Sequence, residues 1–260
     1  MGPKLGDMTN AVRAKLAAGD TVVGALATDT CDEPLLLILR EAGYDFLMLD
    51  CEHGAFGWER VANLCRIGRL IELPIVVRCM ATYEIIRRHL DMGAAGIITP
   101  MTERPEQLSA LRDACFLPPQ GRRGPGGPGN EHVPDFSRQS WQATESSLVL
   151  LPQIETRRAM DNLDLFAEEW LTGAMLGPYD LMMDLGLPFE DYGRPGSEHE
   201  RAILRIVSGL AERGKPCAMV VGDGEDARRW IDAGCRIVVC GELGDMVRRQ
   251  ATANLEQIRR

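Results

Sequence analysis

Two acidic residues each follow a short apolar segment, and together they have the chemistry to bind a divalent cation. Glu155 ends the segment Val149–Glu155, and Asp180 comes shortly after the apolar Leu176. The stretch between the two acids is long enough for one helix and one returning strand. In a parallel sheet the two strands would be neighbours, and their carboxyl ends would lie at the same edge. The pair therefore predicts a cation site at one end of a sheet.

Charged and hydrogen-bonding side chains also stand at the ends of other apolar segments. Each of them, taken alone, also fits a helix cap or a surface ion pair. Together at the carboxyl ends of barrel strands they predict an active site, because barrel enzymes place their reacting groups there. The residues are Asp50, Glu52, His53, Arg78 and Gln153.

Short apolar segments alternate with longer segments of helical periodicity along the chain. The expected strands are Thr21–Thr28, Phe46–Cys51, Ile75–Cys79, Gly96–Met101, Leu148–Ile154, Gly173–Gly177, Cys217–Val221 and Arg236–Cys240. The expected helices are Pro34–Ala42, Trp58–Ile71, Tyr83–Met92, Pro105–Cys115, Arg157–Glu169, Glu198–Arg213, Glu225–Ala233 and Leu243–Ile258. This alternation predicts βαβ units and a parallel sheet. Eight units favour a closed α/β fold, a (β/α)₈ TIM barrel in a single domain over residues 1–260. An open doubly wound sheet fits less well, because no G-x-G-x-x-G segment opens a helix after the first strand.

The segment 117–147 departs from this alternation, since it is rich in Pro, Gly and Arg and longer than a barrel connection needs. A lid, an oligomer contact and a simple flexible loop are its alternative interpretations. Because it connects a helix to the next strand, the strand order places it at the end of the barrel opposite the site.

Composition and charge restrict the class of partner. The 260 residues are 45% apolar and 26% charged, which suits a large buried core, and the net charge of −9 argues against nucleic acid. No apolar run reaches the ~20 residues that cross a bilayer, and the N-terminal segment lacks a secretory signal. The eight cysteines show no C-x-x-C or zinc spacing, so we expect reduced core residues rather than nucleophiles. We therefore expect a cytoplasmic protein with a small-molecule partner and no membrane partner.

A set of ordered motifs resembles a known family over roughly residues 20 to 245. The chain is similar to the HpcH/HpaI aldolases, a family of class II, metal-dependent pyruvate aldolases. The resemblance implies a lyase that cleaves or forms 4-hydroxy-2-oxo acids from pyruvate and an aldehyde. It also implies a homo-oligomer, commonly a hexamer built as a trimer of dimers, in which the last helix is swapped onto a neighbour or closes its own barrel. The motifs are Leu49–Gly54, Val76–Arg78, Leu90–Gly96, Pro100–Met101, Pro118–Gly124, Gln153–Glu155 and Leu176–Leu181.

The same resemblance implies a role for each matching residue. Glu155 and Asp180 resemble the metal-binding carboxylates, and Arg78 resembles the arginine that contacts the pyruvyl oxygens. His53 resembles the acid/base histidine, and Asp50 resembles its neighbour in the same motif. Asp91 resembles a carboxylate that steadies the histidine across a subunit contact. Gln153 resembles a residue that hydrogen-bonds the bound oxo acid. Gly177 and Pro178 are expected to contact the substrate.

The residue types suit the chemistry of a pyruvate enolate. A cation chelated by the substrate stabilises the enolate as its charge develops, and oxygen ligands favour Mg²⁺ or Mn²⁺, with Co²⁺ also compatible. Arg78 would add a fixed pair of donors to the same oxygens. His53 would move the proton of the 4-hydroxyl directly or through a water on the cation. A Schiff-base mechanism needs a lysine at the barrel mouth. The lysines Lys4, Lys15 and Lys215 all precede strands or lie near the N-terminus, so that mechanism is excluded.

Some residues depart from the family pattern on the side of the acceptor. After Arg78 the family often has an aromatic, a polar residue and an acid, whereas this chain has Cys79–Tyr83. Leu243 stands at about the position where the family commonly has an aspartate. The loop after Pro118 is richer in Pro and Gly, with Asn130–His132 beyond it. Decarboxylation of oxaloacetate, a biosynthetic bond-forming synthase, and a barrel that binds metal and oxo acid without catalysis therefore stay open. The other histidines, His89, His132 and His199, are expected in solvated or capping roles.

Overall fold

The computed structural model describes residues 5–124, 126 and 137–259. Within these ranges eight parallel strands follow one another around a closed barrel in chain order, and the last bonds to the first. This confirms the predicted (β/α)₈ barrel. The strands are β1 (Val22–Ala27), β2 (Phe46–Asp50), β3 (Ile75–Arg78), β4 (Gly96–Thr99), β5 (Val149–Ile154), β6 (Ala174–Leu176), β7 (Cys217–Val221) and β8 (Ile237–Glu242).

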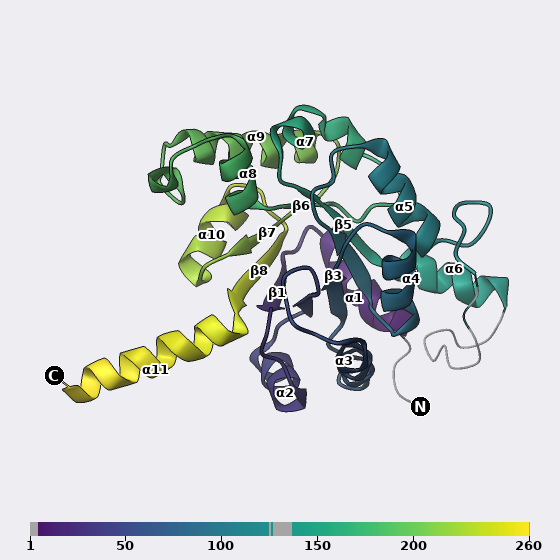
Figure 1. The fold of residues 1–260 in the computed structure, drawn as a ribbon, viewed down its shortest axis with the longest axis horizontal. Coiled ribbons are helices and arrows are strands. Elements are labelled where there is room, and N and C mark those ends of the chain that lie inside the picture. Colours follow the sequence, from purple (N-terminus) through teal and green to yellow (C-terminus); the bar gives the residue numbers. More distant parts are fainter. Residues whose placement is uncertain (1–4, 125, 127–136, 260) are drawn as a thin grey trace.

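Helices surround the barrel, and the last one, α11, extends away from it toward the C-terminus (Figure 1). None of the described helices combines the length and apolarity needed to cross a bilayer. The α-helices are α1 (Leu5–Ala17), α2 (Glu33–Ala42), α3 (Trp58–Leu70), α4 (Tyr83–Asp91), α5 (Pro105–Cys115), α6 (Arg138–Ser147), α7 (Arg157–Asp161), α8 (Pro178–Asp184), α9 (Glu198–Glu212), α10 (Gly224–Asp232) and α11 (Leu243–Arg259), with 3₁₀ turns η1 (Leu163–Phe166) and η2 (Phe189–Asp191).

Alternation along the strands decides which side chains enter the barrel. Successive strand residues point to opposite faces, so one set packs under the helices and the other fills the interior. Phe46, Met48, Val76 and Leu151 belong to one buried interior cluster. The residues two positions further along the same strands are Asp50, Arg78 and Gln153. The same periodicity that builds the core therefore points these polar side chains into the mouth of the barrel.

The end of the barrel opposite the mouth is covered by α1, a helix that the sequence analysis did not predict. Val12 of α1 is buried in the interior cluster, and the Arg13 guanidinium donates to the Leu148 carbonyl and to the Thr172 hydroxyl. Both acceptors stand just before strands, at the amino end of the sheet. Helix α1 also contacts α6.

Two predicted segments differ from the structure. The helix expected over Arg157–Glu169 is wrong in its second half, because α7 ends at Asp161 and only the short turn η1 follows. The segment 117–147 contains helix α6, whose N-cap Ser137 accepts a hydrogen bond from the Ser140 amide. It lies at the amino end of the barrel, as the strand order predicts, and its residues 125 and 127–136 lie outside the described ranges.

Candidate functional site

The ends of β2 and β3 hold a buried ion pair. Asp50 and Arg78 are register partners on the two strands, and Arg78 Nε donates to Asp50 Oδ1 at 2.9 Å while Nη2 donates to Oδ2. Asp50 is only 1% exposed and also accepts the backbone amides of Glu52 and His53. Burial by itself raises the pKa of Asp50, but the bonds and charge of Arg78 outweigh it and lower the pKa. The carboxylate thus stays ionised and fixes the direction of the guanidinium.

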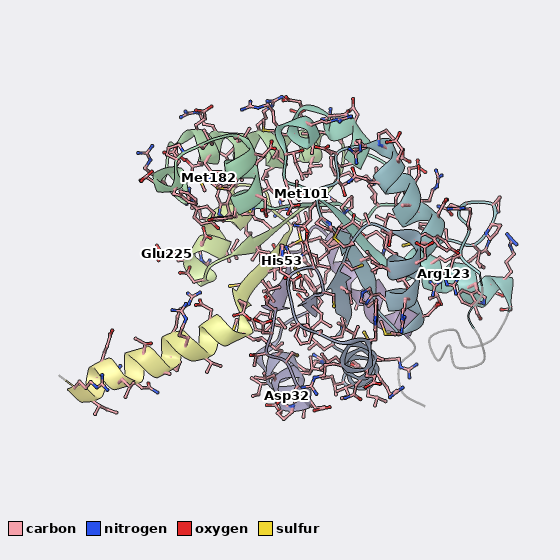
Figure 2. All side chains as sticks on the ribbon, in the orientation of Figure 1. Asp32, His53, Met101, Arg123, Met182 and Glu225 are labelled. Atoms are coloured by element: carbon pink, nitrogen blue, oxygen red, sulfur yellow. The ribbon has the colours of Figure 1, made fainter. Side chains whose placement is uncertain are left out.

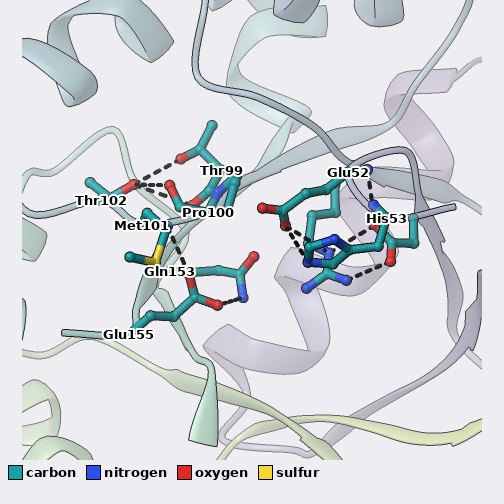
Figure 3. A network of polar contacts seen from close by, with 10 residues as sticks. Glu52, His53, Thr99, Pro100, Met101, Thr102, Gln153 and Glu155 are labelled. Carbon is teal, nitrogen blue, oxygen red and sulfur yellow. Dashed lines mark hydrogen bonds and ion pairs between the residues drawn. The ribbon is translucent and has the colours of Figure 1, made fainter. Parts of the chain in front are cut away.

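Glu52 and His53 lie beside this pair. Glu52 Oε2 stands 3.4 Å from Arg78 Nε and 3.8 Å from His53 Nε2, and the His53 side chain is 66% exposed (Figure 3). Burial raises the pKa of Glu52 in spite of the charge of Arg78. Glu52 is a functional candidate that the sequence analysis placed at the end of the second strand without assigning it a specific role. Its position in the motif with His53 was the available signal.

Glu155 is the most constrained acid of the site. It is 2% exposed, its Oε2 accepts the Met101 amide at 2.7 Å, and its Oε1 accepts Gln153 Nε2 at 2.6 Å (Figure 3). Met101 adopts a left-handed backbone with φ of 49°, which costs conformational energy in a residue with a side chain. The turn after β4 is therefore held in a strained form that aims one amide at the carboxylate.

The electrostatic surroundings of Glu155 favour a cation. Burial raises the pKa of Glu155 to about 7, and the negative charges of Asp180 and Glu52 add to the effect of burial against the Met101 bond and the charge of Arg78. A positive ion placed between these acids would remove that penalty, because opposite charge favours the ionised form.

Six of the predicted residues meet at a cavity of about 320 Å³ in the barrel mouth, whereas Asp50, His53 and Asp91 are not part of its lining. Glu155 lines it with Asp180, which is exposed at the start of α8. Gly177 lies against Glu155, and a Cβ there would lie 2.3 Å from Glu155 Oε1. The absence of a side chain at Gly177 therefore leaves room for the Glu155 carboxylate at the edge of the cavity. The predicted residues in the lining are Arg78, Gln153, Glu155, Gly177, Pro178 and Asp180.

These groups fit a divalent cation. In the described part of the chain no group of three or more His, Cys, Asp or Glu side chains is close enough to hold an ion. Mg²⁺ suits such a site, since it binds through one or two carboxylates and leaves its other positions to substrate and water. The Oε1 atom of Gln153 is buried and has no hydrogen-bond partner among the described residues. It supplies a free acceptor beside Glu155.

Asp91 lies away from this cavity. It is at the end of α4, and its carboxylate pairs with Arg87 at 3.5 Å and with the buried Arg123 at 3.1 Å. Figure 2 places Arg123 toward the edge of the molecule and His53 and Met101 near its centre. The structure does not bring Asp91 to the His53 of the same chain.

The lysines and cysteines take structural positions in the described residues. Lys15 pairs with Asp45, and Lys215 donates to the Glu168 and Leu171 carbonyls, at the amino end of the sheet. Lys4 lies outside the described ranges. All eight thiols are free, and burial raises the pKa of Cys51, beside the site, to about 12. Cys51 is therefore a protonated thiol at neutral pH.

Two histidines differ from the expectation of solvated or capping roles. His89 is buried, its ring centroid lies 5.0 Å from that of Trp58, and burial, followed by the charge of Arg88, lowers its pKa to about 4. His199 is also buried, and its Nε2 lies 2.7 Å from the Pro178 carbonyl oxygen. The expectation was wrong for both, because the helices that carry them turn these positions toward the protein interior. His132 lies outside the described residues.

Comparison with known proteins identifies the family to which this chain is similar. The HpcH/HpaI aldolase/citrate lyase family matches residues 31–248. A hydroxypyruvate/pyruvate aldolase of Delftia acidovorans is 30% identical over 229 residues, covering 85% of this chain and 82% of that protein. A 2-keto-3-deoxy-L-rhamnonate aldolase of Klebsiella pneumoniae is 28% identical over 90% of this chain and 87% of its own length.

A solved structure shows the same fold. The HpcH/HpaI aldolase of Desulfitobacterium hafniense superimposes with a TM-score of 0.86 over 95% of this chain and 96% of that chain, at 21% identity. At 21% identity this similarity shows the fold alone. The family match and the aldolases that are similar in sequence indicate a lyase. This chain belongs to the HpcH/HpaI aldolase/citrate lyase family and is a lyase.

Proposed function

We propose that this protein is a divalent-metal-dependent aldolase that cleaves or forms 4-hydroxy-2-oxo acids through the enolate of pyruvate. The observation that carries the proposal is the meeting of Glu155 and Asp180 at the mouth cavity, with Arg78 in the same lining. The relatives named as hydroxypyruvate/pyruvate and 2-keto-3-deoxy-L-rhamnonate aldolases support a 2-oxo acid as the substrate.

Glu155 and Asp180 would hold the cation, with Mg²⁺ or Mn²⁺ as first choice and Co²⁺ compatible. When bound, the ion supplies positive charge where the enolate oxygen becomes negative. The protein keeps Glu155 in place through Met101 and Gln153, so the carboxylate needs no reorganisation to receive it.

The other residues bind and orient the substrate. Arg78, fixed by Asp50, presents its guanidinium to the carboxylate and 2-oxo oxygens of pyruvate. Gln153, Gly177 and Pro178 border the same cavity and limit how the oxo acid enters. His53 would move the proton of the 4-hydroxyl, and its exposed ring, next to Glu52, is free to approach the acceptor end of the substrate.

Exchange of the pyruvate methyl protons for deuterium tests this proposal. With added Mn²⁺ the wild-type protein should exchange them without any aldehyde, because enolate formation needs only the donor. Glu155→Gln should slow exchange by about 100-fold, through loss of a charged ligand. Asp161→Asn, at an exposed ion pair with Arg205, is the matched control and should exchange normally. Absence of exchange in the wild-type protein would contradict the proposal.

Analysis of the products, together with the exchange assay, separates the alternative reactions on this scaffold. An aldolase consumes a 4-hydroxy-2-oxo acid and releases an aldehyde together with pyruvate. A decarboxylase releases carbon dioxide from oxaloacetate without an aldehyde, and a synthase consumes oxaloacetate only with a second substrate. A barrel that only binds metal and oxo acid would show affinity for oxalate without proton exchange.

The protein is further proposed to act as a homo-oligomer, a hexamer or trimer of dimers, in the cytoplasm. Helix α11 exposes Val247, Leu255 and Ile258 at 59%, 48% and 78%, which suits packing on a neighbouring subunit. Asp91 would then reach the His53 of that neighbour. Eight free thiols suit a reducing compartment. Leu255→Lys with Ile258→Lys should lower the mass measured by light scattering, and an unchanged mass would count against a role for α11.

A further inference from the structure

His199 stands in the first turn of α9 and reaches across to the turn that carries Asp180. Its ring is 2% exposed, and Nε2 lies 2.7 Å from the carbonyl oxygen of Pro178. A carbonyl oxygen only accepts hydrogen bonds, so the proton of the bond must be on Nε2. The contact is therefore a directed hydrogen bond from α9 to the start of α8.

The bond is separate from the capping of α9. The N-cap is Ser197, whose hydroxyl accepts the Glu200 amide, so His199 is not needed to satisfy the first turn. Its ring is also stacked on Tyr192, with centroids 5.5 Å apart and planes inclined by 23°. The stack and the bond together fix both the position and the rotation of the imidazole.

The turn that receives the bond leads directly into the cation site. On its other side the Gly177 amide donates to the Ile154 carbonyl of β5, so the turn is tied to the strand that precedes Glu155. Tyr192 in turn packs edge-on against Tyr179, the residue before Asp180, with centroids 5.9 Å apart. Helix α8 has only seven residues, so contacts of this kind, rather than helix propensity, must hold its first turn.

We infer that His199 is a positioning residue for Asp180, which sets that carboxylate opposite Glu155 by holding the Pro178 carbonyl. The inference rests on the proposed function, because it assigns Asp180 to the cation. It predicts that the hydrogen bond, and not the bulk of the ring, determines how tightly the site binds Mn²⁺. Outer contacts of this kind typically change metal affinity by about 10-fold to 100-fold when they are removed.

The test is calorimetric titration of the full-length protein with Mn²⁺ in the absence of substrate. His199→Phe keeps a ring for the stack on Tyr192 and removes the donor, and it should weaken Mn²⁺ binding by at least about 10-fold. His89→Phe is the matched control, because His89 is equally buried and lies on α4, away from the cavity. It should leave the Mn²⁺ affinity unchanged, although both variants change thermal stability.

A second pair of variants keeps the test valid if the phenylalanine variant does not fold. His199→Gln places an amide nitrogen at the reach of Nε2, whereas His199→Asn places one a bond shorter. The glutamine variant should bind Mn²⁺ like the wild type, and the asparagine variant should bind it as weakly as the phenylalanine variant.

The outcomes distinguish this inference from the proposed function. If the wild-type protein binds Mn²⁺ and His199→Phe, or His199→Asn, binds it equally well, the inference is wrong and the proposed function stands. If the wild-type protein itself does not bind Mn²⁺, both are overturned together. Equal weakening in His199→Phe and in the control His89→Phe would show a general loss of packing, which also contradicts a specific role for the Pro178 bond.

Discussion

Asp50 and Arg78 face each other across adjacent strands and are joined by two hydrogen bonds, with Nε donating to Oδ1 at 2.9 Å. A forked pair of this kind fixes the plane of the guanidinium, which a single bond would leave free to rotate. Asp50 also accepts the Glu52 and His53 amides, so one buried carboxylate orders both the arginine and the motif that carries His53.

Asp50→Asn should therefore damage the site without touching substrate. The amide cannot accept both guanidinium bonds, and Arg78 would be left as a poorly paired, largely buried cation, which costs about 3 kcal/mol of unfolding free energy. We expect proton exchange on pyruvate to slow by about 100-fold, because the donor fork is misplaced. Urea unfolding and the exchange assay measure the two effects. Asp161→Asn is the control for the loss of an exposed ion pair. Normal exchange in Asp50→Asn would contradict the role assigned to the Asp50–Arg78 pair.

Gly177→Ala should weaken the cation site by crowding Glu155. The added Cβ would lie 2.3 Å from Glu155 Oε1 and 2.5 Å from its Cγ, so the carboxylate must move. We expect Mn²⁺ affinity to fall by about 10-fold or more in calorimetry. Gly222→Ala is the matched control, since Gly222 borders the same cavity and a Cβ there meets no atom within 4 Å. Equal affinities in the two variants would show that Glu155 does not need the space at Gly177.

His89 should make the folded protein sensitive to acid. Its pKa is lowered from 6.5 to about 4, so between these values the unfolded chain binds a proton that the folded chain does not. Above pH 6.5 His89 is neutral in both states and the folded protein keeps its full stability. As the pH falls from 6.5 toward 4, the free energy of unfolding decreases by roughly 3 kcal/mol in total. His89→Phe should remove this part of the pH dependence. Urea midpoints measured across the window, for both proteins, check the difference in slope; parallel curves would be evidence against a neutral buried His89.

Borohydride should not trap pyruvate on this protein. Lys15 and Lys215 are held at the amino end of the barrel by Asp45 and by backbone carbonyls, away from the cavity. We expect no mass increase after incubation with pyruvate and borohydride, whereas a chelator should stop proton exchange and Mn²⁺ should restore it. Lys15→Arg and Lys215→Arg serve as controls with normal exchange. A trapped adduct on either lysine would overturn the metal-dependent assignment.

The sequence by itself determined the barrel and the direction of several site residues. Its alternation of strand and helix segments predicted eight parallel strands, and the alternation within strands required Asp50, Arg78 and Gln153 to share the face of the interior core. These are properties of local periodicity, which each segment carries in its own residues. The acids Glu155 and Asp180 followed from the same logic, because parallel strands bring their carboxyl ends together.

Only the tertiary structure decided the contacts between elements that are far apart in the chain. The left-handed turn that aims the Met101 amide at Glu155 depends on the packing of β4 beside β5. The role of α1 in covering the barrel depends on where its Val12 comes to rest. The bond from His199 to Pro178 joins residues 21 positions apart that share no sequence pattern. Periodicity reports which face of an element is apolar, but it carries no information on which atom of another element that face will meet.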